Sequence, residues 1–172
     1  MTSRSIVDRM LGALRLQSAV YEEIEADQKA TGEAAFIIVA TSLVSGAVNG
    51  VLTGASSGFF GALGSLLGWA FYAWIAYIVG VKLLPGPETK SSWGELARTL
   101  GYANTARFLI IFELIPGLRA ITRTVVAIWV LVATVVALRS ALDITTGRAI
   151  VVAIASVLGQ LIIIAIALSA FG

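Results

Sequence analysis

The sequence predicts an all-α polytopic membrane protein with five transmembrane helices and an N-terminal amphipathic helix at the membrane surface. Of its 172 residues, 58% are hydrophobic and 13% are charged, whereas soluble domains carry about 45–50% apolar and about 25% charged residues. The mean hydropathy is +0.93. Apolar runs of about 18 residues or more recur along the chain, and each is long enough to cross a hydrocarbon core of about 30 Å as an α-helix.

The residue types that the chain lacks exclude several kinds of chemistry. It contains no Cys and no His, so disulfides, thiolate or imidazole metal sites and catalysis by either side chain are excluded. The pattern contains no convergent carboxylates, no Ser/Lys pair at one depth and no phosphate-binding loop. We therefore expect no enzymatic activity, no metal and no cofactor. The net charge of +2 predicts no nucleic-acid partner.

Residues 1–33 are expected to form a cytoplasmic segment with one amphipathic helix over residues 4–24. The first half of this helix is basic, with Arg4, Arg9 and Arg15 outside the apolar stripe, and suits anionic lipid headgroups. The second half is acidic and suits solvent or a basic partner. The alternative is a helix that packs on its own bundle. No cleavable signal peptide is visible, so we expect the N-terminus to lie in the cytoplasm.

The second predicted domain, residues 34–172, holds the five spans. They are expected over residues 34–53, 59–81, 99–116, 121–138 and 149–170. Pro116 and Gly117 break the chain between the third and fourth spans. With the N-terminus inside, most Lys and Arg residues fall in cytoplasmic loops, as the positive-inside rule requires. Five crossings would place the C-terminus outside.

Four charged residues lie within the apolar stretch around the third and fourth spans. Glu113 and Arg123 sit on either side of Gly117, which predicts similar depths on antiparallel helices. We expect them to pair, with Arg119 close by, because a lone carboxylate in the membrane is costly. A proton relay or ion site at Glu113, or shallow exposure to solvent, are the alternatives. Arg107 can extend its side chain toward the headgroups without a special role.

Small residues at a four-residue spacing predict close helix packing. They are Ser42, Gly46, Gly50, Gly54 and Gly58, followed by Gly64 and Gly68. The pattern leaves open whether the neighbouring helix belongs to this chain or to a second protein. Asn49 and Gln160 also lie in apolar spans, and each needs a hydrogen-bond partner within the bundle.

The segment from residue 93 to about 153 resembles the Yip (Ypt-interacting protein) domain family of five-span membrane proteins, particularly its prokaryotic members. The matching elements are Arg98, Gly101, Tyr102 and Ala103, then Pro116, then Trp129, then the run "ALRSALDITTGRAI". The resemblance implies a non-enzymatic membrane protein in a prokaryotic inner membrane. Eukaryotic relatives act in vesicle trafficking through Rab-type small GTPases.

The sequence departs from the family pattern in two places. Many bacterial members have a proline three residues after the Gly-Tyr-Ala element, where this chain has Ala106 followed by Arg107. The N-terminal region is also much shorter than the cytosolic segment of the eukaryotic relatives. We therefore do not expect binding of a small GTPase.

These observations favour a scaffold, assembly factor or accessory subunit that packs against lipids and other membrane protein subunits. The candidate cytoplasmic contacts with partners are Arg98, Gly101, Tyr102, Glu22 and Glu23. The alternative function is a small transporter or channel for an ion or solute, as a homo-oligomer, with Glu113, Asn49 and Gln160 lining a polar path.

Overall fold

The computed structural model describes the backbone of residues 4–54 and 58–171, and their side chains except at 58–62, 164, 166–168, 170 and 171. The described chain is entirely helical, with no strand, which confirms the predicted all-α class. The helices are α1 (Ile6–Leu14), α2 (Ser18–Ala26), α3 (Ala30–Thr53), α4 (Gly58–Tyr77), the π-helix η1 (Ile78–Leu83), α5 (Trp93–Ala103), the 3-10 helix η2 (Asn104–Leu114), α6 (Arg119–Leu142) and α7 (Thr146–Phe171).

Four helical segments in the described part of the chain are long and apolar enough to cross a membrane. They are Ala30–Thr53, Leu63–Leu83, Arg119–Leu142 and Thr146–Ile163. The prediction of five spans is therefore wrong at the third one, 99–116, which is divided between α5 and η2. The division has a local cause, because the side-chain amide of Asn104 donates to the carbonyl of Leu100 at 2.8 Å and so competes for an α-helical acceptor.

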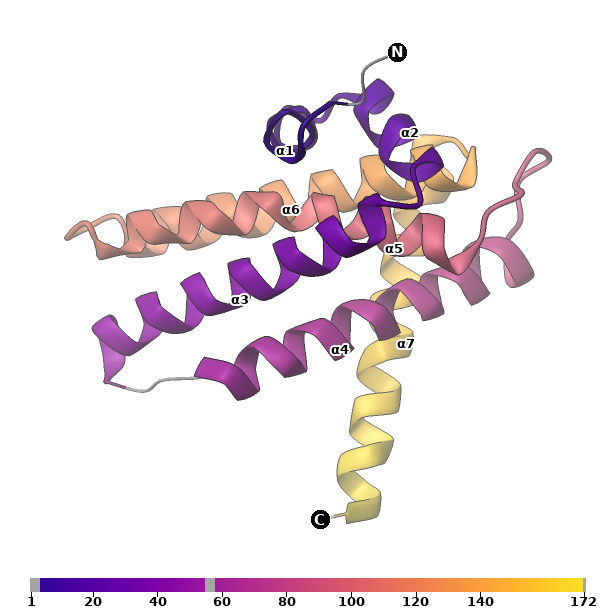
Figure 1. Cartoon of the computed structure of the whole chain (residues 1–172). Helices are drawn as coiled ribbons and strands as arrows, with labels where there is room; N and C mark the ends of the chain where they lie inside the picture. The colour runs from indigo at the N-terminus through magenta and orange to yellow at the C-terminus, as the bar shows by residue number, and fades with distance from the viewer. Residues whose placement is uncertain (1–3, 55–57, 172) are drawn as a thin grey trace.

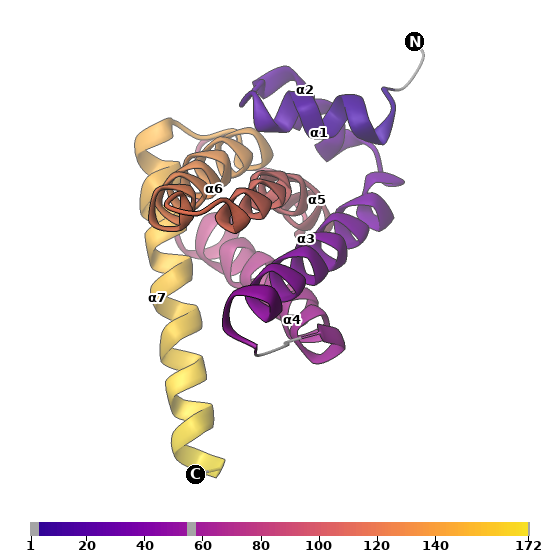
Figure 2. The same ribbon diagram turned by 90° about the vertical axis from the view of Figure 1, so that its left-hand side faces the viewer.

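The axes of the helices from α3 to α6 are roughly aligned, and the axis of α7 crosses them. Figure 1 shows α3, α4, the α5–η2 segment and α6 running back and forth beside one another. α7 begins beside the end of α6 and crosses the other helices at a steep angle, so that its C-terminal part leaves the bundle in both views (Figures 1 and 2). The N-terminal part of α7 packs on α6 and α4.

The N-terminal segment contains two helices where the sequence predicted one. Ser5 and Asp8 form a capping box that begins α1. α1 ends before Leu16, which has a positive φ of 59° and therefore interrupts the helical path. Tyr21 and Ile24 of α2 are fully buried against the bundle. Trp129 in the middle of α6 donates its indole N–H to the carbonyl of Leu14 at 2.9 Å. The N-terminal segment therefore packs on the bundle of its own chain, which was the alternative to a helix lying on the membrane surface.

One close helix contact involves a glycine outside the predicted small-residue pattern. A Cβ added at Gly101 would lie 2.5 Å from the Cβ of Ala34, so α5 contacts α3 at the level of the backbone. Gly64 instead has no atom within 4 Å of such a Cβ, and Gly68 has only the Gln160 amide at 3.9 Å.

The remaining members of the predicted pattern lie along α3 and at the start of α4. Gly46 is buried, and Gly54 ends α3 with a φ of 73°. Ser42 donates to the carbonyl of Ile38 at 2.7 Å. Gly50 is half-buried. The surroundings of Gly58 lie outside the described residues.

Candidate functional site

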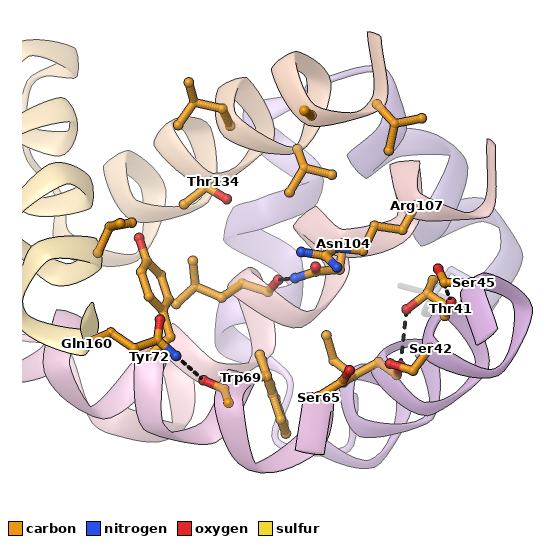
Figure 3. A pocket seen from close by; sticks show the side chains of 18 of the residues that line it. Thr41, Ser42, Ser45, Ser65, Trp69, Tyr72, Asn104, Arg107, Thr134 and Gln160 are labelled. Carbon is orange, nitrogen blue, oxygen red and sulfur yellow. Dashed lines mark hydrogen bonds between the residues drawn. The ribbon is translucent and has the colours of Figure 1, made fainter. Parts of the chain in front are cut away.

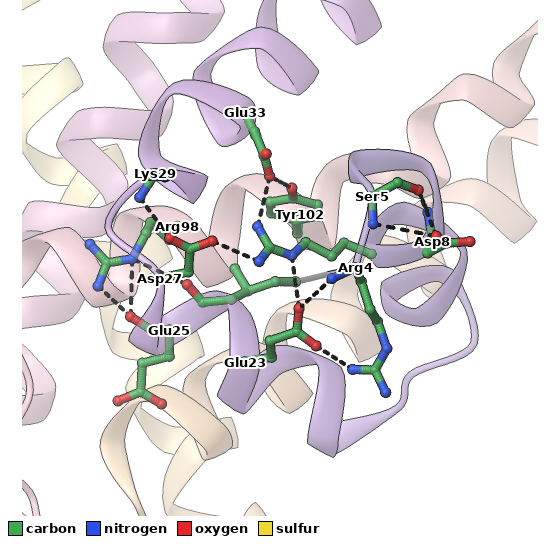
Figure 4. A network of polar contacts seen from close by, with 12 residues as sticks. Arg4, Ser5, Asp8, Glu23, Glu25, Asp27, Lys29, Glu33, Arg98 and Tyr102 are labelled. Carbon is green, nitrogen blue, oxygen red and sulfur yellow. Dashed lines mark hydrogen bonds and ion pairs between the residues drawn. The ribbon is translucent and has the colours of Figure 1, made fainter. Parts of the chain in front are cut away.

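One buried guanidinium joins the N-terminal helices to the bundle. Only 2% of the Arg9 side chain is exposed. Its Nε donates to Glu23 at 3.1 Å, Nη2 to Asp27 at 2.7 Å and Nη1 to Glu33 at 3.1 Å (Figure 4). The hydroxyl of Tyr102 also donates to Glu33. Because these residues come from α1, α2, the α2–α3 link, α3 and α5, one arginine connects five parts of the chain.

The charges in this network stabilise one another. Burial opposes the charge of Arg9, but its hydrogen bonds to the three carboxylates outweigh burial and raise its pKa. The bond from Arg9 holds the pKa of Asp27 below its usual range. Burial opposes the charge of Glu23 as well, and the bonds from Arg9 and Arg4 still lower its pKa. Basic and acidic halves of the N-terminal segment therefore bind each other.

Glu25 shows the opposite behaviour within the same helix. Burial, followed by repulsion from Glu95 and Asp143, raises the pKa of Glu25 to about 7. Arg98 opposes this increase and Glu22 adds to it. The Glu25 carboxylate points away from the Arg98 guanidinium, which bonds instead to the backbone carbonyl of Glu25 (Figure 4).

Most of the residues predicted to contact partners are used inside the fold. Arg98 is buried and donates to the carbonyls of Ile24 and Glu25 at the end of α2, at 3.2 and 3.1 Å. Gly101 and Tyr102 are buried in the α3–α5 contact. Glu23 bonds Arg9 and Arg4. Of the five candidates, Glu22 alone is exposed.

The structure brings together the charges predicted to fasten the third and fourth segments. Arg123 binds Glu113 through two parallel bonds, from Nε to Oε1 at 3.0 Å and from Nη2 to Oε2 at 3.1 Å. Glu113 has no exposed side-chain surface, and Arg119 lies 3.8 Å from its Oε2. The carboxylate thus faces two guanidinium groups, of which Arg123 holds it in the bidentate geometry that arginine favours.

A groove of about 810 Å³ lies between α3, α4, η2, α6 and α7 (Figure 3). Asn104, Arg107 and Ile110 line it from η2. They lie in one row because a 3-10 helix has about three residues per turn, so that side chains three positions apart eclipse. Gln160 of α7 also lines the groove and donates to the carbonyl of Gly68 at 3.3 Å.

The residues predicted to line a polar path are not gathered in this groove. Gln160 lines it, but Glu113 and Asn49 do not. Within the described residues, no three acidic, His or Cys side chains are close enough to hold a metal ion. The groove offers instead hydroxyl, amide and guanidinium groups from α3, α4 and η2, while the lining from α6 and α7 is mostly apolar and also carries Thr134 and Gln160 (Figure 3).

The Arg9 network predicts a large loss of stability for Arg9→Gln. The variant leaves three carboxylates without their shared cation, and removing one partner of a buried ion pair costs about 3–5 kcal/mol. The free energy of unfolding, measured by tryptophan fluorescence during an SDS titration in mixed micelles, should fall by that amount. Arg15→Gln is the control, because Arg15 is exposed at the end of α1, and it should change the value by less than about 0.5 kcal/mol. Equal effects of the two variants would contradict the role of Arg9.

The raised pKa of Glu25 predicts that the stability of the chain depends on pH. Its pKa is about 7 in the folded chain and about 4.5 when unfolded, so its contribution is fully present below pH 4.5 and is lost as the pH rises through 7. Glu25→Gln should therefore raise Tm relative to the original chain at pH 8 and not at pH 5. Allowing for solvent screening, we expect about 2–4 °C, which corresponds to about 1 kcal/mol in a chain of this size. Glu88→Gln, at an exposed site that does not act on Glu25, should show no such difference between the two pH values.

The Glu113–Arg123 pair predicts asymmetric single variants. Arg123→Gln leaves a buried carboxylate with only the distant Arg119, whereas Glu113→Gln leaves an arginine that reaches solvent or headgroups. Arg123→Gln should thus lower Tm more than Glu113→Gln, and the double variant should recover part of the loss. A double variant whose loss equals the sum of both would show that the two side chains do not interact.

Comparison with known proteins agrees with this architecture of apolar helices. A family model described as the Yip1 domain matches residues 11–168 of the chain, from α1 almost to the end of α7. No curated protein and no solved structure gives a significant match. Since the matched region covers nearly the whole sequence, the chain belongs to the Yip1 domain family.

Proposed function

We propose that this chain is a non-enzymatic scaffold, assembly factor or accessory subunit of a prokaryotic inner membrane, which works by packing its helices against other membrane protein subunits. The observation that carries the proposal is α7. No charged residue follows Arg148, and beyond its contacts with α4 and α6 the helix leaves the bundle (Figures 1 and 2). Leu158, Leu161 and Ile162 are each more than half exposed.

The direction of α7 distinguishes it from the other exposed helices. The lipid-facing surfaces of α3, α4 and α6 belong to helices that already pack on one another. In α7, by contrast, the face that carries Leu158, Leu161 and Ile162 is exposed beside the contact of Gln160 with Gly68, and we take this face as open to a second protein. In a membrane, helices associate through close van der Waals packing and hydrogen bonds, and an exposed apolar face provides the surface for the first of these.

The N-terminal helices support a partner within the membrane rather than a soluble one. Residues 4–33 are fastened to the bundle through Arg9 and Arg98, so the described segment offers no free arm to a small GTPase. The concentration of Lys and Arg at the loops beside this segment favours a cytoplasmic position for it. We include neither a small GTPase nor a nucleic acid among the partners.

A transporter or channel is supported less well. The groove could form part of a polar path, and Gln160 lies in it. Glu113, however, does not line the groove and is held in a bidentate ion pair with Arg123. A titratable carboxylate in the path, which that alternative required, is therefore missing from the described groove lining.

The test is the composition of the native particle. We expect the chain, purified from its own membrane in nanodiscs, to form a particle of defined stoichiometry with a second membrane protein, as measured by mass photometry and peptide mass spectrometry. Leu161→Ala combined with Ile162→Ala should release that protein. The control Val51→Ala removes a still more exposed apolar side chain from α3 and should leave the particle intact. A particle containing only this chain and lipid would refute the proposal.

A further inference from the structure

The groove has two chemically different walls. On one side, hydroxyl and amide groups from α3, α4 and η2 face it, including Ser45, Ser65 and Asn104. On the other side, α6 and α7 contribute mainly apolar side chains, with Thr134 and Gln160 among them, and Leu131, Ile154 and Leu158 are each more than half exposed. The exposed rim shows that the groove opens to the surroundings between α6 and α7. An occupant of this groove must be polar along one side and apolar along the other.

The polar wall carries one uncompensated positive charge. Two arginines line the groove, Arg107 and Arg123, and no acidic residue does so among its described lining. Arg123 is neutralised by Glu113. Arg107 has neither an ion pair nor a hydrogen bond within the described chain, and its side chain extends beside Asn104 in Figure 3. An arginine among apolar helices is costly when its charge is not compensated.

We propose that the groove is a binding site for one anionic phospholipid, with the phosphate on Arg107 and an acyl chain along the α6–α7 wall. Arginine binds phosphate oxygens through two parallel N–H donors. The Asn104 amide, which has a second N–H beside the one bonded to Leu100, and the Ser65 hydroxyl also line the groove. The volume of about 810 Å³ lies within the range of about 300–1,000 Å³ typical of ligand sites, and the open rim lets the rest of the lipid remain in the bilayer.

The charge of the groove favours a lipid over a second copy of this chain. The unpartnered apolar helix that a second copy would offer is the outer part of α7, which contains no charged residue. Its insertion would leave Arg107 without an anion in a still drier environment. A free phosphate ion would satisfy Arg107 but would leave the apolar wall uncovered. An anionic phospholipid satisfies both walls at once. This inference does not depend on the proposed scaffold function.

The test measures lipid retention by native mass spectrometry. Protein in nanodiscs of phosphatidylcholine with one fifth phosphatidylglycerol of the same acyl chains is released into the gas phase, and the bound lipids are counted. We expect one phosphatidylglycerol on the original chain and at least about tenfold weaker retention by Arg107→Gln, because hydrogen bonds to charged groups are the strong ones. Arg107→Lys keeps the charge but not the planar donors, so its retention should be intermediate. Arg119→Gln, outside the groove lining, should retain the lipid.

A second variant examines the apolar wall with Arg107 intact. Ala127 is exposed and lines the groove, so Ala127→Trp fills it and should also release the lipid. An unchanged Tm in both variants separates loss of the site from loss of the fold. Equal retention by Arg107→Gln and the original chain would overturn the proposal. So would displacement of the lipid by millimolar inorganic phosphate, or a lipid-free dimer that these variants dissociate.

Discussion

The N-terminal part of the structure depends on the compensation of one buried cation, Arg9. A guanidinium withdrawn from water is stable only when its donors meet acceptors, preferably charged ones. Here the acceptors are carboxylates on Glu23, Asp27 and Glu33, and no single helix carries all of them. Satisfying one side chain therefore determines where α1 lies relative to α2 and α3. Tyr102 adds α5 to the same set through Glu33.

The position of α5 in turn determines the geometry of the groove. α5 is held against α3 at Gly101, where the backbone of Ala34 leaves no room for a larger residue, and against α2 through Arg98. From this fixed start the chain continues as a 3-10 helix of 11 residues, which is long for a conformation usually limited to short runs. In an α-helix, positions 104, 107, 110 and 113 would spread around the axis, whereas in η2 they form one row. That row turns Arg107 toward the groove and Glu113 toward Arg123.

The sequence allowed the elements governed by composition and spacing to be predicted. The apolar runs indicated membrane helices, and the Pro116–Gly117 break suggested that Glu113 and Arg123 would lie at one depth, where the structure places them in contact. The break at Asn104 was harder to predict from the sequence, since it depends on a side-chain hydrogen bond that competes with the backbone hydrogen bonds of the helix. The small-residue spacing states what a helix can accommodate and does not identify its neighbour, and the close contact at Gly101 lies outside it.

The buried network could not be assigned from the sequence because opposite charges 14 to 24 residues apart match equally well a solvated surface, a lipid contact or each other. The turn between α1 and α2 brings the opposite charges together. Leu16 interrupts the helix, so that α2 folds back and its acidic face contacts Arg9. A basic half followed by an acidic half of similar length is nevertheless a signal for such self-pairing.

Three arginines in different surroundings, Arg9 buried and Arg107 and Arg123 exposed, illustrate how far the chain compensates its own charges. Arg9 is satisfied by three carboxylates and Arg123 by one. Arg107, in contrast, has its donors directed at an open groove without an acidic residue in the described lining. Water can reach the groove and reduces the cost of the charge, but water does not cover the apolar wall contributed by α6 and α7. The two requirements coincide in one place, and a molecule that carries an anionic group and a hydrocarbon chain meets both. The compensation that the fold supplies internally for Arg9 and Arg123 is thus left, for Arg107, to the lipid around the protein.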